Sequence, residues 1–184
     1  MIGQRSIGLG FAAWLLAAGS VGAETVRAVP DDLAGTPIAF FDGRARSTGT
    51  ITTLFVSTEA FTARFEGDLA KRELTLDEEF TFADGKALQR WALFAHRDGS
   101  VSGTVQTEIA DGTLMPPVRV VGEYAPDRLV LSYDGYAPNG SDMVLHFHHV
   151  MRSQNDGTVT NRVTVSKFYL PLATSSVTFY KPGR

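Results

Sequence analysis

The chain has 184 residues, of which 43% are hydrophobic and 20% are charged, so it is long enough for one domain with a hydrophobic core and is not composed like a disordered chain. Its formal net charge of −3 and the lack of a basic run argue against nucleic acid as a partner. The absence of cysteine excludes disulfides, thiolate metal sites, cysteine nucleophiles and a lipidated N-terminal cysteine.

Residues 1–23 are predicted to be a secretory signal peptide. Arg5 supplies a positive charge, residues 7–18 form an apolar run, and Val21 and Ala23 place small residues where signal peptidase recognises them. The apolar run is shorter than the roughly 20 residues that a transmembrane helix needs. Because no Arg-Arg pair is present, we expect export by the general secretion route, cleavage after Ala23 and a soluble protein in the periplasm.

The next segment, residues 24–39, is expected to hold one short helical turn at residues 29–33, with Pro30 near its start. From about Arg44 onward, apolar and polar residues alternate over short segments, as they do in strands with one buried face. Asp-Gly turn signals separate several of these segments, at residues 84–85, 98–99, 111–112 and 156–157.

About nine or ten such segments follow one another without a long helical pattern. A sheet of that many strands joined by short turns removes its unpaired edges by closing on itself. We therefore predict an all-β domain over residues 40–184, folded as a single antiparallel up-and-down lipocalin-like (calycin-type) β-barrel of about 8–10 strands. A two-sheet sandwich is the alternative.

Several stretches resemble a bacterial family known as domain of unknown function 3833. They are, in order, Phe40-Phe41-Asp42-Gly43, the run from Leu74 to Gly85, Arg90-Trp91, and the run from Asn161 to Phe168. The resemblance covers nearly the whole chain after the leader, and it implies an exported or lipid-anchored lipocalin-like barrel. Genes of the family lie near genes for fatty-acyl modification, which implies a lipid ligand.

Two features depart from the family pattern. Many relatives carry a lipobox cysteine, whereas this chain has none, so we expect it to be unanchored. Relatives tend to have a Phe-Asp-Asp-Trp run where this chain has Phe147-His148-His149-Val150. Any role of that acidic pair is therefore in doubt here.

Glu78 is the polar residue that fits its predicted surroundings least. It falls on the same strand face as Leu76 and Phe80, where desolvation raises the pKa of a carboxyl group unless a cation or several donors meet it. One interpretation is a general acid or base, or an anchor for a ligand head group. The other, which we favour, is a buried ion pair with Arg90 or Lys167.

Other candidates for the barrel interior are more ordinary. Asn161 and Lys167 share a strand face with Val163 and Val165, although Lys167 is more simply explained as a strand-end side chain that reaches water. His149 lies on an apolar face, as a core histidine or a cavity residue. The predicted ligand-binding set is therefore Glu78, Arg90, Trp91, His149, Asn161 and Lys167.

No metal site and no cofactor are predicted. His146 and His148 share a strand face, but that face is opposite the apolar one and no third ligand is indicated. The sequence also has no Gly-x-Ser-x-Gly elbow, phosphate loop or dinucleotide-binding motif.

The favoured function is a periplasmic protein that binds or carries a hydrophobic small molecule, expected to be a fatty acyl chain or lipid, with transient contact to the membrane surface or to lipid-modifying enzymes. One alternative is an isomerase or cyclase of a lipid-like substrate that uses Glu78 as acid or base. Another is a non-catalytic structural or assembly partner in the envelope, which predicts a filled barrel and an exposed apolar patch.

Overall fold

The computed structural model describes residues 29–54 and 56–183. The predicted signal peptide therefore lies outside the described residues. Within them, one short helix precedes ten strands: α1 (Pro37–Phe40), β1 (Gly43–Thr53), β2 (Ser57–Ala70), β3 (Glu73–Thr81), β4 (Lys86–Ala95), β5 (Ser100–Thr107), β6 (Val118–Ala125), β7 (Arg128–Gly135), β8 (Leu145–Ser153), β9 (Val159–Lys167) and β10 (Leu170–Tyr180).

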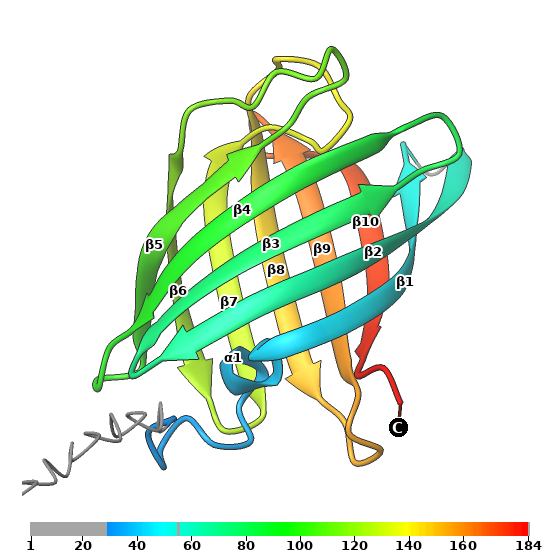
Figure 1. The fold of residues 1–184 in the computed structure, drawn as a ribbon. Coiled ribbons are helices and arrows are strands. Elements are labelled where there is room, and N and C mark those ends of the chain that lie inside the picture. The colour runs from blue at the N-terminus through cyan, green and yellow to red at the C-terminus, as the bar shows by residue number, and fades with distance from the viewer. Residues whose placement is uncertain (1–28, 55, 184) are drawn as a thin grey trace, which may run out of the picture.

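The strands form one closed antiparallel barrel (Figure 1). Each strand pairs with the strands before and after it in the chain, and β1 pairs with β10 to close the sheet. Every strand thus has two hydrogen-bonded neighbours, which leaves no exposed sheet edge. The predicted up-and-down barrel is confirmed, and the alternative of a two-sheet sandwich is wrong.

Alternation along the strands sorts the side chains between the barrel wall and its interior. In β4, for example, Gln89, Trp91 and Leu93 are buried inside, whereas Arg90 and Phe94 are exposed on the outer face. The interior faces of all ten strands contribute to one hydrophobic core.

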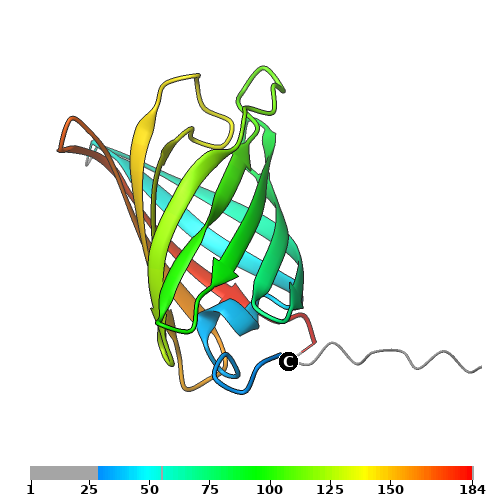
Figure 2. The same cartoon turned by 90° about the vertical axis from the view of Figure 1, so that its left-hand side faces the viewer.

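The N-terminal segment covers one end of the barrel, with α1 lying across that end (Figures 1 and 2). The predicted helical turn at residues 29–33 is instead an irregular turn, and the helix begins at Pro37. Thr36 caps α1 by accepting a hydrogen bond from the amide of Ala39, and Pro37 suits the first helical position because no amide hydrogen is needed there.

Close packing of this segment on β2 depends on Gly67. A Cβ atom at that position would lie 2.0 Å from the carbonyl oxygen of Phe41, which no real side chain tolerates. Phe41 in turn packs its ring against Phe65 and Phe179, with centroid distances of 5.7 and 5.1 Å. This aromatic cluster seals the covered end, which we call the closed end of the barrel.

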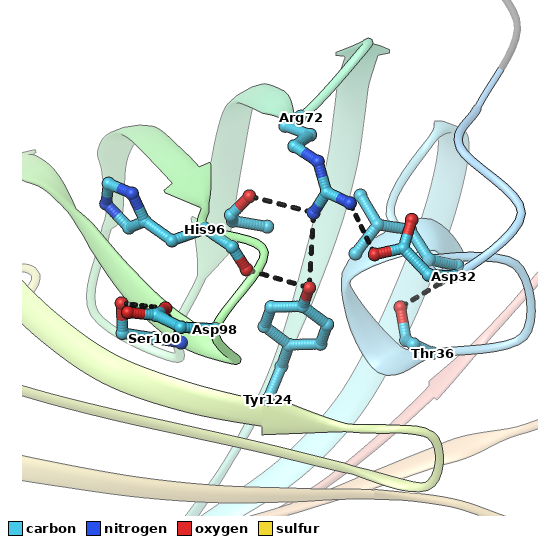
Figure 3. Close-up of polar contacts among 9 residues, drawn as sticks. Asp32, Thr36, Arg72, His96, Asp98, Ser100 and Tyr124 are labelled. Atoms are coloured by element: carbon cyan, nitrogen blue, oxygen red, sulfur yellow. Dashed lines mark hydrogen bonds and ion pairs between the residues drawn. The ribbon is translucent and has the colours of Figure 1, made fainter.

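Polar contacts of Arg72, in the turn between β2 and β3, hold the N-terminal segment in place (Figure 3). Its guanidinium donates hydrogen bonds to the carbonyl oxygen of Ala95 and the hydroxyl of Tyr124, at 3.1 and 3.2 Å, and forms an ion pair with Asp32. The Tyr124 hydroxyl donates to the carbonyl oxygen of His96 at 2.9 Å. These bonds connect the segment to three different parts of the barrel.

The opposite end, where the chain turns between β1 and β2, between β7 and β8, and between β9 and β10, is not covered by a helix (Figure 1). We call it the open end. Among the described residues, no helix has the length and apolarity that crossing a membrane requires.

Candidate functional site: the barrel cavity

The barrel encloses a cavity of about 360 Å³. This volume lies within the range of roughly 300–1,000 Å³ that is usual for small-molecule sites. Most of the lining is aliphatic or aromatic, and it reaches the open end at Thr53, Met143 and Leu172. Five polar side chains other than tyrosine and threonine take part in the lining: Glu78, Gln89, His149, Asn161 and Ser175.

Two aromatic groups bound the cavity at different depths. Near the closed end lies the cluster of Phe41, Phe65 and Phe179. Near the open end, the ring of Phe61 lies 5.8 and 5.7 Å from those of Phe80 and Phe82. The polar side chains come from the middle of the strands, between these groups, so that apolar walls lie above and below them.

Glu78 lies inside the barrel, where the indole Nε1 of Trp91 donates a hydrogen bond to its Oε2 at 3.2 Å. The side chain is only partly covered by its neighbours because it faces the cavity, yet the barrel wall separates it from bulk water. Burial raises the pKa of this carboxyl from an ordinary 4.5 to about 8, and the bond from Trp91 offsets only part of that rise. Glu78 is therefore mostly protonated and neutral at pH 7.

His149 is neutral for the same physical reason. Burial, with a small contribution from the nearby His148, lowers the pKa of the His149 imidazole from 6.5 to about 4. Its Nδ1 lies 3.2 Å from Nδ2 of Asn161. With the amide donating, Nδ1 accepts, and the ring proton lies on Nε2.

Tyr133 links these groups to the polar pair Gln89 and Thr107. Its ring stacks on His149 at 5.7 Å and packs edge-to-face on Trp91 at 5.5 Å. Gln89 donates a hydrogen bond of 2.9 Å to Thr107 and also bonds the Tyr133 hydroxyl, while burial holds the pKa of that hydroxyl well above its usual value. The phenol is therefore un-ionised at neutral pH.

The cavity thus presents neutral hydrogen-bonding groups at pH 7, and no lysine or arginine of the described residues lines it. Three buried polar atoms on its wall have no hydrogen-bond partner within the described chain: Nε2 of His149, Oδ1 of Asn161 and Oγ of Ser175. A buried polar atom without a partner costs about 1–3 kcal/mol. A ligand or a water molecule gains a hydrogen bond at these atoms once small side-chain movements expose them to the cavity.

The structure brings four of the six predicted site residues together in the cavity: Glu78, Trp91, His149 and Asn161. Trp91 connects them, since it bonds Glu78 and its ring centroid lies 5.9 Å from that of His149.

Arg90 and Lys167 do not join this group. Arg90 is exposed on the outer face, where its Nε lies 3.6 Å from Oδ1 of Asp77, and Lys167 lies at the end of β9 with its Nζ 5.6 Å from the ring centroid of Phe168. The ion pair considered for Glu78 with either residue is therefore wrong. The physical reason is register: β3 and β4 pair without a bulge, so Arg90 lies opposite Asp77 and points outward with it.

His146 and His148 face outward, as their spacing predicts. His146 Nδ1 lies 2.9 Å from Oδ1 of Asp134, and His148 Nδ1 lies 2.9 Å from Oγ of Ser132. In the part of the chain that the structure describes, no three acidic or histidine side chains gather as a metal site would require.

Sequence reasoning missed Gln89 and Ser175, although a signal for each was present. Gln89 is two residues from Trp91 and Ser175 two from Val177, so alternation places both on inward faces. Gln89 is also the direct cross-strand partner of Glu78.

The sequence pattern of one family, described as Protein of unknown function (DUF3833), matches residues 15–181. The chain belongs to the DUF3833 family. That match spans all ten strands and every residue of the cavity wall, so the barrel is the domain that the family shares. No curated protein matches the chain. The closed barrel and its internal cavity are consistent with a lipocalin-like protein that binds a small molecule.

Proposed function

We propose that this DUF3833 protein binds and carries a hydrophobic small molecule, a fatty acyl chain or another lipid, inside its barrel. The observation that carries the proposal is the cavity of about 360 Å³, whose wall is apolar except for one group of neutral polar side chains at mid-depth. An apolar wall with a few convergent polar groups is the usual composition of a small-molecule site.

The polar groups favour a ligand whose polar end is buried and whose chain extends toward the open end. Protonated Glu78 offers an O–H donor, His149 offers an N–H donor at Nε2, and Asn161 offers an acceptor at Oδ1. A carboxyl, ester or hydroxyl group complements this set. Because no fixed cation faces it, the site favours a head group that stays neutral or accepts hydrogen bonds without an ion pair.

We further propose that the protein works in the periplasm as a soluble carrier. The support comes from the predicted signal peptide at residues 1–23.

The test is displacement of a fluorescent fatty acid from the purified protein, using variants that differ only in whether a bulky side chain enters the cavity. Val165→Trp places an indole in the cavity wall near the open end, and Val121→Trp places one on the outer face of β6. We expect Val165→Trp to weaken binding at least tenfold and Val121→Trp to leave it unchanged. Equal binding by both variants, each shown to be folded, would place the ligand outside the barrel and overturn the proposal.

A second candidate function is an isomerase or cyclase acting on a lipid-like substrate. The observation in its favour is that Glu78, a carboxyl group with a pKa of about 8, faces the same cavity as the unpartnered Nε2 of His149. A general acid with a pKa near the working pH is well suited to donate a proton. His149, with a pKa of about 4, is a weak base, and for that reason we rank catalysis second.

Glu78→Gln separates the two candidates. A carrier with this change keeps its affinity for the displaced fatty acid and returns extracted lipid unaltered, as the wild type does. An isomerase or cyclase converts the extracted lipid in the wild type and stops doing so in Glu78→Gln, which mass spectrometry and chromatography of the lipid detect. A structural role in the envelope predicts a filled barrel together with an exposed apolar patch, and the cavity counts against the first of these two expectations.

A further inference from the structure

Two neighbouring hairpins at the open end expose large apolar side chains. Leu54 and Val56 belong to the turn between β1 and β2. Phe168 and Tyr169 form the turn between β9 and β10, and Leu170 is the first residue of β10. Val56, Phe168 and Tyr169 are 89%, 83% and 101% exposed. We call these five residues the apolar lip.

The two halves of the lip lie side by side. Strands β1 and β10 are hydrogen-bonded partners, and the amide of Leu54 donates to the carbonyl oxygen of Leu172 at 2.7 Å. In Figure 2 both hairpins project beyond the barrel wall at the upper left, on the same side of the open end. The lip is therefore one continuous feature rather than scattered exposed residues.

The backbone at the lip makes its apolar residues unusual. Leu54, Phe168 and Tyr169 have φ values of 46°, 50° and 66°. Such left-handed positions favour glycine, asparagine or aspartate, and two consecutive ones define the turn in which Asn-Gly is the preferred pair. Bulky side chains in a disfavoured conformation at an exposed tip indicate that the side chains themselves have a role.

Two turns at the opposite end of the barrel are polar and have glycine where the backbone has positive φ. At the closed end, the turn between β4 and β5 has Asp98 accepting from the amide of Ser100, and the turn between β8 and β9 has Asp156 accepting from the amide of Thr158. Both aspartates are followed by a glycine with positive φ. The polar turns and the apolar lip lie at opposite ends of the molecule (Figure 2).

The apolar surface continues from the lip into the cavity. Ile51, Val165 and Leu172 belong to the strands that carry the lip, and all three line the cavity. An acyl chain that passes along the lip and over the rim of the open end therefore stays against apolar side chains from the outside to the interior. A lipid surface offers both a partner for the lip and a source of such a chain.

Charge argues for insertion rather than electrostatic attraction. Residues 51–60 and 164–172 contain one acidic and one basic residue, Glu59 and Lys167, and the whole chain carries a net charge of −3. A segment that binds membranes by charge has several lysines or arginines. Lys167 instead lies at the base of the tip beside Phe168, where its ammonium can stay at the level of the head groups.

We propose that the apolar lip inserts into the surface of a lipid bilayer, without a requirement for anionic lipid, and thereby holds the open end of the barrel against the membrane for lipid exchange. This inference goes beyond the proposed binding function, since a barrel that binds lipid from solution need not dock on a membrane.

The experiment exploits the absence of cysteine, which makes any introduced cysteine a unique labelling site. An environment-sensitive fluorophore is attached at Leu170→Cys in the lip and, as the matched control, at Asn155→Cys in the turn between β8 and β9. Phosphatidylcholine vesicles are then added. We expect a blue shift and increased emission for the label at position 170 and none at position 155. No change at position 170, or equal changes at both positions, would overturn the proposal.

A double variant, Phe168→Asn with Tyr169→Gly, provides the second readout. It installs the preferred turn pair, so we expect the fold to be kept, while vesicle co-sedimentation falls at least tenfold because two large apolar side chains no longer leave water. All proteins share the same N-terminal residues, so any contribution of those residues cancels in the comparison. Undiminished co-sedimentation would overturn the proposal. A blue shift of the label at position 170 in the absence of vesicles would also overturn it, because the lip would then be covered by self-association of the protein.

The proposal and the binding function fail in different ways. A lip variant that keeps its affinity for a fluorescent fatty acid in solution but no longer co-sediments supports membrane docking and leaves the cavity function intact. If Val165→Trp loses fatty-acid binding but still co-sediments with vesicles, the cavity function is supported separately from membrane docking.

Discussion

Replacing Glu78 with glutamine is expected to stabilise the protein, and to do so in a pH-dependent way. Glutamine keeps the shape of the side chain and an oxygen that can accept from Trp91, but it has no proton to lose. In the folded protein the Glu78 carboxyl has a pKa of about 8, against an ordinary value of 4.5. Between these two values, the folded state holds a proton that the unfolded state has released.

This difference sets both the sign and the size of the effect. A state that binds more protons is weakened as the pH rises, so Glu78 lowers the free energy of unfolding progressively from about pH 4.5 to about pH 8. At pH 7, about 2.5 pH units above the ordinary pKa, the loss is about 3 kcal/mol at roughly 1.4 kcal/mol per unit, and above pH 8 it levels off near 5 kcal/mol. Glu78→Gln removes this loss.

The assay is equilibrium urea unfolding and thermal unfolding of wild type and Glu78→Gln between pH 4.5 and pH 9. We expect no difference at pH 4.5 and a melting temperature about 6–12 °C higher for the variant at pH 7, since about 2–4 °C accompanies each kcal/mol in a domain of this size. Glu79→Gln, on the exposed face of the same strand, is the control and should change little. A Glu78→Gln variant that is no more stable than wild type at pH 7, or that gains as much at pH 4.5 as at pH 7, would refute the reasoning.

Three further predictions concern other parts of the structure. Affinity for a fluorescent fatty acid should fall above about pH 8 in the wild type and not in Glu78→Gln, because an apolar ligand displaces water from Glu78 and favours its protonated form. Titrations from pH 6 to pH 9.5 that give the same pH profile for both proteins would contradict this. Gly67→Ala should lower the free energy of unfolding by about 1–3 kcal/mol in urea titrations, since its Cβ would meet the Phe41 carbonyl oxygen at 2.0 Å; an unchanged midpoint would show that the closed end yields easily. Arg72→Ala should make limited proteolysis cleave the peptide bonds of residues 29–36 faster, because this segment loses the ion pair between Asp32 and Arg72. Cleavage at the wild-type rate would show that the segment stays packed without that ion pair.

The parts of the fold that follow from local chemistry could be predicted from the sequence. The Asp-Gly pairs at residues 98–99, 111–112 and 156–157 predict turns, and in each the glycine adopts positive φ. Alternation of apolar and polar residues then fixes which face of each strand is buried, and these buried faces form the interior of the barrel. The inward positions of Glu78, His149 and Asn161 follow from the same rule.

Other features depend on contacts between segments that are distant in the sequence. Whether Arg90 or Gln89 faces Glu78 depends on the register of β3 against β4, and one inserted residue in the hairpin would have exchanged them. A short helical turn was expected at residues 29–33, whereas the helix forms at Pro37–Phe40, next to the point where the Phe41 carbonyl packs over Gly67.

The turn between β9 and β10 carries no turn signal at all. Phe168 and Tyr169 occupy positions that normally favour asparagine and glycine, so their positive φ values could not be anticipated from residue preferences. The pairing of β9 with β10 on both sides of the tip imposes that backbone.

Native mass spectrometry of the protein purified from its own source tests the central claim, that the barrel holds a hydrophobic small molecule, most directly. We predict a species heavier than the chain by the mass of one lipid, which is released into organic solvent, and a reduced or absent adduct in the Val165→Trp variant. A wild-type protein that appears only at the mass of the bare chain, even after incubation with fatty acids and phospholipids, would contradict the account.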